Sequence, residues 1–393
     1  MNKIQTFLLL VLLYSCNSEH QRQGEDDKKQ FEQEFFNFDI RNSLNSPKEL
    51  FLSNFVNEIQ YIPLETTPSC LLSEVRYLKI FNDNIFISDN KALYKFNKEG
   101  NFIQQIGKVG SGPGEYGQVF WFSIIEESNE IILLSYPSGR INVHDLETGI
   151  YKRNFKLNFD TNGFIEFPPG KITFFTTDIP QSNNQLINNE IYICNLDGKI
   201  IDSIPNSRLP KKGNIYGKTI YFITNGLLCY MGSYQDTLVV LSGNTKKKPY
   251  VSFDLNNTIN GNEIRLERLI GEIQFPDFLS VNKILENDKY FFINIQKGIG
   301  LYVDDDIHRF LYEKASNLLI YCPYLINNID EGMPFWPKYI HNNTVLIYIL
   351  YPFQIIEHSK SNLTTTNKSD KFIRLANNLK ENDNPILAFV ELK

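Results

Sequence analysis

Residues 92–106 read ALYKFNKEGNFIQQI, in which two runs of strand-forming residues flank a glycine turn. Ala92–Asn97 forms the first run, Lys98-Glu99-Gly100 forms the turn, and Phe102–Ile106 forms the second run. Two short apolar runs joined by a turn that contains glycine are typical of a β-hairpin. The segment decides the fold because the same pattern recurs along the chain.

The hairpins recur at a regular spacing. Further copies lie at Arg140–Leu157, Glu190–Ile204 and Thr237–Leu255, and each copy is preceded by another apolar run. The turn glycines recur in steps of 49, 49 and 45 residues, at Gly100, Gly149, Gly198 and Gly243. A period of this length, with about four short strands in each copy, predicts a β-propeller.

One interval is longer than the others. A fifth, weaker turn is expected at Asp304-Asp305-Asp306, farther from Gly243 than the period requires. Apolar residues such as Leu266, Leu269 and Ile270 recur at helical spacing within this interval. The extra length therefore predicts a short helical insertion near residues 260–278.

A sixth blade is assembled from both ends of the chain. Phe335–Ile340, Thr344–Leu350 and Pro385–Leu392 supply three of its strands, and Val56–Ile62 supplies the fourth. Closing the ring in this way removes the exposed edges that an open sheet would leave. The predicted fold is an all-β, six-bladed β-propeller over residues 51–393. A two-sheet sandwich is the alternative, but it does not explain so long a period.

The first residues predict export and lipidation. Lys3 precedes an apolar run, Phe7–Leu13, that is too short to span a bilayer. The following Leu13-Tyr14-Ser15-Cys16 resembles the lipobox of bacterial lipoproteins, so residues 1–16 are expected to be a signal peptide with Cys16 as the acylated residue. An ordinary signal peptide with an incidental cysteine is the alternative. The polar residues 17–50 are expected to be a flexible tether between lipid and propeller.

Composition disfavours nucleic acid as a partner. The chain has 39 Lys and Arg against 45 Asp and Glu, which gives a formal net charge of −6. Its longest basic run is only Lys246-Lys247-Lys248, so it offers no extended basic patch for a phosphate backbone. The four later cysteines show no metal-binding spacing, and we expect buried thiols, with a disulfide as the open alternative, at Cys70, Cys194, Cys229 and Cys322.

Four longer segments carry a family resemblance. Ile62–Thr67 reads IPLETT, Gly107–Tyr116 reads GKVGSGPGEY, Asn328–Pro337 reads NIDEGMPFWP, and Asp383–Leu387 reads DNPIL. Together they resemble the six-bladed β-propeller lipoproteins of Bacteroidota, which are related in architecture to NHL-repeat propellers. The resemblance covers residues 50–393. It implies the propeller fold and a lipid-anchored location in the cell envelope, at the outer membrane, and it implies no particular activity.

Five residues are candidates for ligand binding. Glu115 and Tyr116 end a glycine-rich connection between blades, which in such propellers lies near one mouth of the channel. The glycine-rich segment lacks the Gly-Lys-Ser/Thr ending of a phosphate-binding loop, so no phosphate cradle is expected. Phe335 and Trp336 are candidates for an aromatic platform, with core packing as the alternative.

Asp330 is the fifth candidate and one of three carboxylates expected near inner-strand ends or blade connections, with Asp89 and Asp178. Turn capping is the alternative role for all three.

No catalytic residue is predicted. The sequence contains neither the H-E-x-x-H nor the G-x-S-x-G motif, and the histidines of the propeller lie far apart, at His144, His308, His341 and His358. No cofactor is expected, although a divalent cation on the axis stays open because a propeller gathers one ligand from each blade.

The favoured function is a non-catalytic, lipid-anchored binding protein for a small molecule, glycan, peptide or envelope protein, linked to nutrient uptake. The alternatives are a metal-dependent hydrolase or lyase and a structural subunit of an outer-envelope complex.

Overall fold

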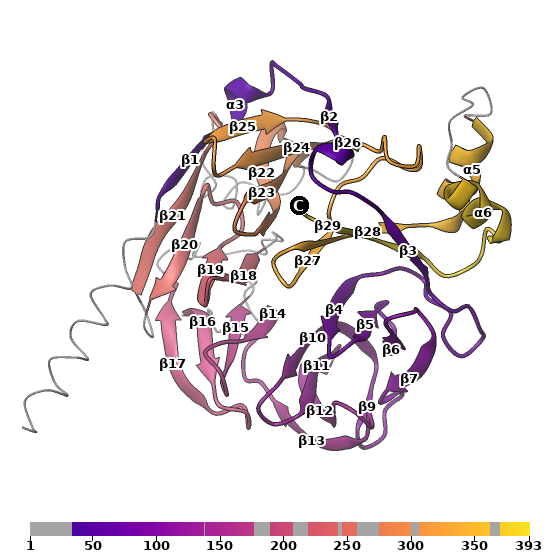
Figure 1. Cartoon of the computed structure of the whole chain (residues 1–393). Helices are drawn as coiled ribbons and strands as arrows, with labels where there is room; N and C mark the ends of the chain where they lie inside the picture. Colours follow the sequence, from indigo (N-terminus) through magenta and orange to yellow (C-terminus); the bar gives the residue numbers. More distant parts are fainter. Residues whose placement is uncertain are drawn as a thin grey trace, which may run out of the picture.

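The computed structural model describes residues 34–136, 138–176, 189–206, 219–242, 246–257, 275–299, 306–361 and 370–393. These residues form six small sheets arranged in a ring, which is a six-bladed β-propeller (Figure 1). The predicted fold class and blade number are therefore confirmed. The expected signal peptide and Cys16 lie outside the described residues.

The first three blades are consecutive four-stranded antiparallel sheets. Blade 1 contains β4 (Tyr77–Phe81), β5 (Asn84–Ser88), β6 (Leu93–Asn97) and β7 (Phe102–Ile106). Blade 2 contains β10 (Gln118–Ile125), β11 (Glu130–Tyr136), β12 (Arg140–Asp145) and β13 (Tyr151–Lys156). Blade 3 contains β14 (Thr161–Glu166), β15 (Ile172–Thr176), β16 (Asn189–Cys194) and β17 (Ile200–Pro205). The short pair β8 (Lys108–Val109) and β9 (Glu115–Tyr116) connects blades 1 and 2.

The glycine turns lie where the repeat predicts them. Gly100, Gly149 and Gly198 separate the third and fourth strands of blades 1, 2 and 3, and they have φ values of +87°, +68° and +80°. Backbone in this left-handed region favours glycine because glycine has no Cβ. Gly243 lies outside the described residues.

Blades 4 and 5 follow the same order of strands. Blade 4 contains β18 (Ile220–Thr224), β19 (Leu227–Met231), β20 (Thr237–Ser242) and β21 (Lys246–Asp254). Blade 5 contains β22 (Phe275–Glu286), β23 (Tyr290–Ile299), β24 (Asp306–Glu313) and β25 (Leu318–Tyr321).

Two expectations for blade 5 need correction. Asp306 is the first residue of the third strand, β24, and Asp304 and Asp305 lie outside the described residues, whereas the turn between the third and fourth strands is residues 314–317. Glycine does not mark that turn because Asn317 takes the left-handed conformation, with a φ of +54°. Of the helical insertion expected at residues 260–278, residues 275–278 are strand and the others lie outside the described residues.

Both ends of the chain build blade 6, as predicted. Its strands are β27 (Tyr339–His341), β28 (Val345–Leu350), β29 (Ile386–Glu391) and the N-terminal β3 (Gln60–Pro63). Strand β3 pairs antiparallel with β29, with Pro63 opposite Ile386. Two helices that the sequence analysis did not predict, α5 (Pro352–Ser361) and α6 (Asp370–Asn378), lie between β28 and β29 and project from the side of the ring (Figure 1). Within the described ranges, the helices are all too short or too polar to cross a membrane.

Residues 36–63 form a strap along blades 4, 5 and 6 (indigo in Figure 1). Its first strand, β1 (Phe36–Asp39), pairs in parallel with the outer strand β21 of blade 4. The short helix α3 (Ile40–Ser43) follows, and then β2 (Leu50–Phe51), which pairs with β26 (Leu325–Ile326), and the 3-10 helix η1 (Leu52–Asn54). Phe36–Asp39 and Leu50, which fall within the tether expected at residues 17–50, pair with strands of the ring, and residues 17–33 lie outside the described residues.

Two phenylalanines attach the strap to the propeller. Phe36 and Phe38 are 5% and 1% exposed and lie between blades 4 and 5. The ring centroid of Phe38 lies 4.6 Å from that of Tyr312 and 5.6 Å from that of Phe253. The neighbouring Phe35 is 54% exposed. Burial of aromatic surface, and not only the β1–β21 hydrogen bonds, therefore holds the strap in place.

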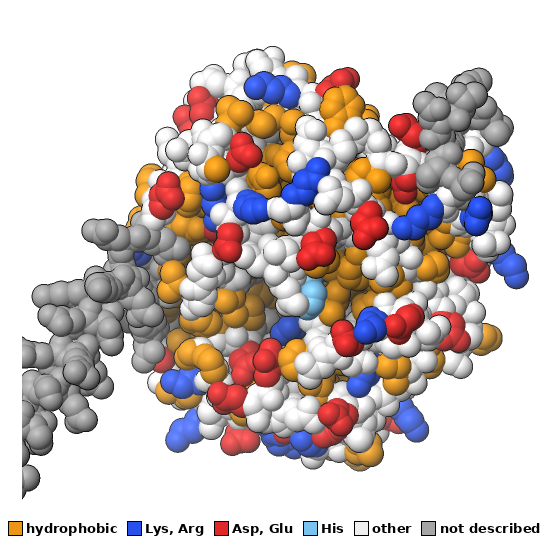
Figure 2. Space-filling view, viewed as in Figure 1, with side chains coloured by type: hydrophobic (Ala, Val, Ile, Leu, Met, Phe, Trp, Pro, Cys, Tyr) orange, Lys and Arg blue, Asp and Glu red, His pale blue; other side chains and the backbone are white. Residues whose placement is uncertain are grey.

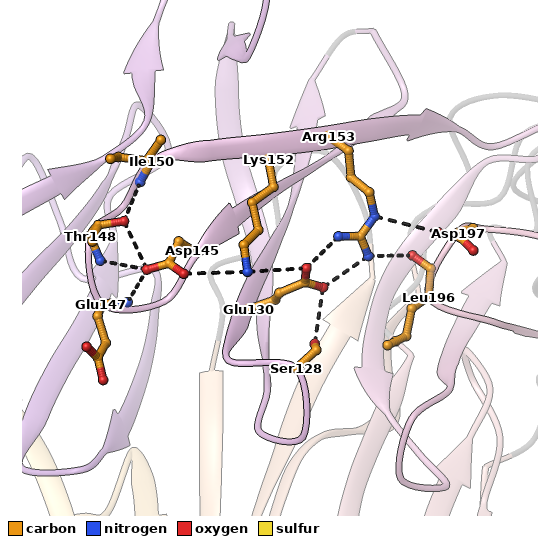
Figure 3. Close-up of polar contacts among 10 residues, drawn as sticks. All are labelled: Ser128, Glu130, Asp145, Glu147, Thr148, Ile150, Lys152, Arg153, Leu196 and Asp197. Carbon is orange, nitrogen blue, oxygen red and sulfur yellow. Dashed lines mark hydrogen bonds and ion pairs between the residues drawn. The ribbon is translucent and has the colours of Figure 1, made fainter.

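A polar network joins blade 2 to blade 3 (Figure 3). Arg153 donates two hydrogen bonds to the Glu130 carboxylate, of 2.5 and 3.0 Å, and one of 3.2 Å to the carbonyl of Leu196 in the next blade. Lys152 Nζ lies 3.5 Å from carboxylate oxygens of both Glu130 and Asp145. Burial alone would raise the pKa of Glu130, but the hydrogen bonds and charge of Arg153 lower it overall. The paired carboxylate thus remains ionised between two blades.

We expect Phe38→Ala to lower the free energy of unfolding by about 3–5 kcal/mol, because it removes a fully buried aromatic ring. Phe35→Ala is the matched control and should change it by no more than about 0.5 kcal/mol. Urea denaturation followed by far-ultraviolet circular dichroism measures both. Equal effects of the two substitutions would show that the strap does not stabilise the ring.

Candidate functional site

A central cavity of about 1480 Å³ runs along the axis of the ring. The first strands of all six blades line it, namely β4, β10, β14, β18, β22 and β27. Because each blade presents one strand to the axis, the cavity brings together residues that lie far apart in the sequence. Figure 2 shows acidic and basic side chains interspersed around the centre of the ring.

Three tyrosines from three blades contribute to the cavity lining. They are Tyr77 of blade 1, Tyr221 of blade 4 and Tyr339 of blade 6. Burial raises the pKa of each phenol, and the neighbouring Tyr77 further raises the pKa of the other two. The hydroxyl of Tyr339 donates a hydrogen bond of 3.2 Å to the carbonyl of Arg76. All three phenols are therefore neutral at physiological pH and can act as hydrogen-bond donors or acceptors.

Glycine at the corresponding position of blade 3 makes room for this arrangement. A Cβ on Gly163 would lie 2.1 Å from the hydroxyl oxygen of Tyr221 and 3.1 Å from Cδ1 of Trp121. The φ of Gly163 is +152°, which also disfavours any residue with a side chain. The side chains of Tyr221 and Trp121 can both lie this close to the backbone of blade 3 only because residue 163 is glycine.

Two lysine ammonium groups line the cavity without a paired carboxylate. Burial lowers the pKa of Lys79, while the charges of Glu126 and Glu166 act in the opposite direction. Burial also lowers the pKa of Lys338, against the attraction of Glu74. Neither Nζ atom forms a hydrogen bond or an ion pair with another described residue. These two ammonium groups are therefore not fully satisfied by direct contacts with the described residues.

Aromatic side chains continue this surface at the end of the cavity where the first strands begin. The guanidinium carbon of Arg76 lies 5.6 Å from the ring centroid of Phe120, and Arg76 Nη1 lies 3.8 Å from the carboxylate of Glu74. The ring of Phe120 lies 5.2 Å from that of Tyr136, which is 53% exposed. We call Arg76, Lys338, Phe120 and Tyr136 the rim.

The predicted residues Glu115 and Tyr116 lie away from the cavity lining. The Glu115 carboxylate folds back onto its own loop and accepts a hydrogen bond of 2.8 Å from the Gly112 amide. Tyr116 is 1% exposed and donates a hydrogen bond of 2.6 Å to the carbonyl of Ile106. Burial raises the pKa of Tyr116 to about 12. Both side chains are satisfied within the connection between blades 1 and 2.

The other three candidates lie together near blade 6. Asp330 is 5% exposed and accepts hydrogen bonds from Tyr61, Gly332 and Asn327. Phe335 and Trp336 are 2% and 5% exposed in one hydrophobic core, and Trp336 Nε1 donates to Asn294. None of the five candidates is among the residues that line the central cavity. Their role in binding a ligand stays a prediction.

The remaining polar candidates differ in their environments. Asp89 is fully buried and caps a turn, where it accepts hydrogen bonds from the amides of Lys91 and Ala92. Asp178 lies outside the described residues. His341 lines the cavity, and burial lowers its pKa. Among the described residues, no three His, Cys, Asp or Glu side chains are grouped so that they could hold a metal ion. The cysteines are buried and unpaired at Cys70, Cys194, Cys229 and Cys322.

The cavity residues were not predicted from the sequence because each is a single polar or aromatic residue within an ordinary apolar strand. Tyr77 and Lys79, for example, alternate with Leu78 and Ile80. The repeat of the blades was the signal from which the cavity residues could have been found. Aligning the first strand of each blade on the hairpins would have identified the positions that all face the axis.

The fold defines a six-bladed β-propeller, and its central cavity is the candidate binding site. The chain belongs to the family described as "Domain of unknown function (DUF4934)", whose model matches residues 35–391. A comparison with curated proteins finds no matching sequence.

Two solved structures from Bacteroides are similar to this chain. One, described as an exported protein of Bacteroides fragilis, is 19% identical with a TM-score of 0.70, and the match covers 92% of this chain and 100% of that chain. The other is a member of the DUF4221 family from Bacteroides vulgatus, 12% identical with a TM-score of 0.49 over 86% of this chain and 97% of that chain. At these identities the likeness to the first structure shows the fold alone.

We expect Gly163→Ala to lower the free energy of unfolding by about 1–3 kcal/mol through overlap with the Tyr221 hydroxyl. Gly226→Ala is the control, because Gly226 also has a positive φ, of +72°, but no atom lies within 4 Å of a Cβ there. Denaturant unfolding measures both. The cost of Gly163→Ala should fall in a Tyr221→Phe background, and an unchanged cost there would contradict the assigned overlap.

Proposed function

We propose that this protein is a non-catalytic binding protein, anchored in the cell envelope by a lipid, that holds its ligand in the central cavity. The observation that carries the proposal is the cavity itself. It combines neutral phenols, an aromatic rim and two ammonium groups that form no ion pair with any described residue. A concave site with apolar faces and a few convergent polar groups is the usual form of a ligand site.

The N-terminal sequence supports the proposed location. Cys16 ends an apolar run that resembles a lipobox, and the strap begins at Phe36. The similar structure from Bacteroides fragilis is described as an exported protein. Lipidation at Cys16 followed by residues 17–35 would tether the ring to a membrane without a transmembrane segment. The outer membrane is the membrane that we propose, from the family resemblance.

The anchor is tested with the full chain expressed in a member of the Bacteroidota. We expect metabolic labelling with a palmitate analogue to label the wild-type protein and to leave Cys16→Ser unlabelled. Cys70→Ser is the matched control and should remain labelled, because that thiol is buried. Mass spectrometry of the mature N-terminus identifies the modified residue. An unmodified Cys16 in the wild-type protein would contradict the proposed anchor.

The ligand site is tested through one of the two tryptophans of the chain. Trp121 lines the cavity, whereas Trp336 is buried in the core near blade 6. We expect at least one member of a probe panel to change the fluorescence of the wild-type protein and not that of Trp121→Phe. The panel contains maltotriose, trigalacturonate, a chondroitin sulfate oligosaccharide and tetraglutamate. Emission that responds to no member of the panel would contradict binding in the cavity.

A further inference from the structure

Positive charge from three blades gathers at the rim end of the cavity. Lys283 of blade 5 donates a hydrogen bond to the carbonyl of Lys338 in blade 6, and its Nζ lies 4.7 Å from the ring centroid of Tyr339. The Tyr339 hydroxyl in turn donates to the carbonyl of Arg76 in blade 1. These contacts link the three cationic residues into one arc. The Lys283 side chain is held by its hydrogen bond and by its cation–π contact, and the Arg76 side chain by Phe120 and Glu74, so both are positioned before any ligand arrives.

Among the described residues, the carboxylates near Arg76 and Lys338 do not neutralise both cations. Glu74 is the acidic residue that acts on Lys338, and it also accepts a hydrogen bond from Asn90 and lies 3.8 Å from Arg76. The other glutamates that line the cavity, Glu126 and Glu166, act instead on Lys79. Among the described residues, Arg76 and Lys338 therefore share the single carboxylate of Glu74 at the rim end. Such a surface favours an anionic group on the ligand.

The aromatic residues of the rim favour a ligand that also has an apolar face. The ring centroids of Phe120 and Trp121 lie 5.9 Å apart, and those of Phe120 and Tyr136 lie 5.2 Å apart. Arg76 stacks on Phe120 and so presents its guanidinium beside an aromatic face. A pyranose ring has an apolar face of C–H groups that packs on such aromatic rings and hydroxyls that bond to phenols. An anionic saccharide satisfies the aromatic and the cationic groups together.

The size of the cavity favours an extended ligand. Its volume of about 1480 Å³ exceeds the roughly 300–1,000 Å³ of typical small-molecule sites. A single sugar would leave much of this space to water, whereas an oligosaccharide can extend from the rim along the first strands. From the charge, the aromatic rings and the volume together, we propose that the cavity binds an anionic oligosaccharide, with its acidic group at Arg76 and Lys338. This inference rests on the proposed ligand site in the cavity.

The same fluorescence titration of the full chain tests the ligand class. We expect trigalacturonate or the chondroitin sulfate oligosaccharide to bind at least about tenfold more tightly than maltotriose, because a charge-assisted hydrogen bond is lost with the neutral sugar. Binding should weaken as sodium chloride is added. The carboxylated and the sulfated probe distinguish the two sources of the anion, and tighter binding of either one supports the proposal.

Substitutions at the rim test where the anionic group of the ligand binds. We expect Arg76→Gln and Lys338→Gln each to weaken binding of the anionic probe by about tenfold, with little change for maltotriose. Lys199→Gln is the matched control, since Lys199 is exposed on the β16–β17 turn and does not line the cavity. Circular dichroism verifies that each variant is folded.

Two results would overturn the inference and leave the proposed function in place. One is maltotriose or tetraglutamate binding through Trp121 as tightly as the anionic sugars. The other is an anionic sugar whose binding is unchanged by both rim substitutions. Failure of every probe to alter Trp121 emission would instead contradict the proposed ligand site itself.

Discussion

The pairing of β3 with β29 is the constraint on which the rest of the molecule depends, because it closes the ring through blade 6. Closure packs the first strand of blade 6 between those of blades 5 and 1 and so fixes the distance of every first strand from the axis. The cavity follows directly from that constraint. Tyr77, Tyr221 and Tyr339 converge only because blades 1, 4 and 6 are held at set angles around the axis.

The architecture could be predicted from the sequence because its signals are local and repeated. A glycine turn such as Lys98-Glu99-Gly100 specifies a hairpin by itself, and its recurrence specifies the number of blades. The predicted position of the turn in blade 5 was wrong because that turn is not marked by glycine. Asn317 replaces glycine in the turn of blade 5, and the strap around Phe38 is too short and irregular to show a period.

The site could not be predicted in the same way, because its residues are related only through the ring. Lys283 and Arg76 lie in blades 5 and 1, and no spacing along the chain connects them. The segments conspicuous in the sequence, such as the one that contains Tyr116, prove to be connections whose polar groups are bonded internally. The unusual composition of these segments thus reflects the irregular backbone of a connection and not a binding site. The cavity residues lie instead on regular strands.

The strap also determines how the molecule responds to mechanical load. Any pull on the N-terminal end of the chain reaches β1 before it reaches the closing strand β3. The ladder from Phe36 opposite Val251 to Asp39 opposite Asp254, and the two buried phenylalanine rings, must separate first. The contact between β1 and blade 4 therefore separates first under load, while blade 6 stays closed and the axial cavity keeps its shape.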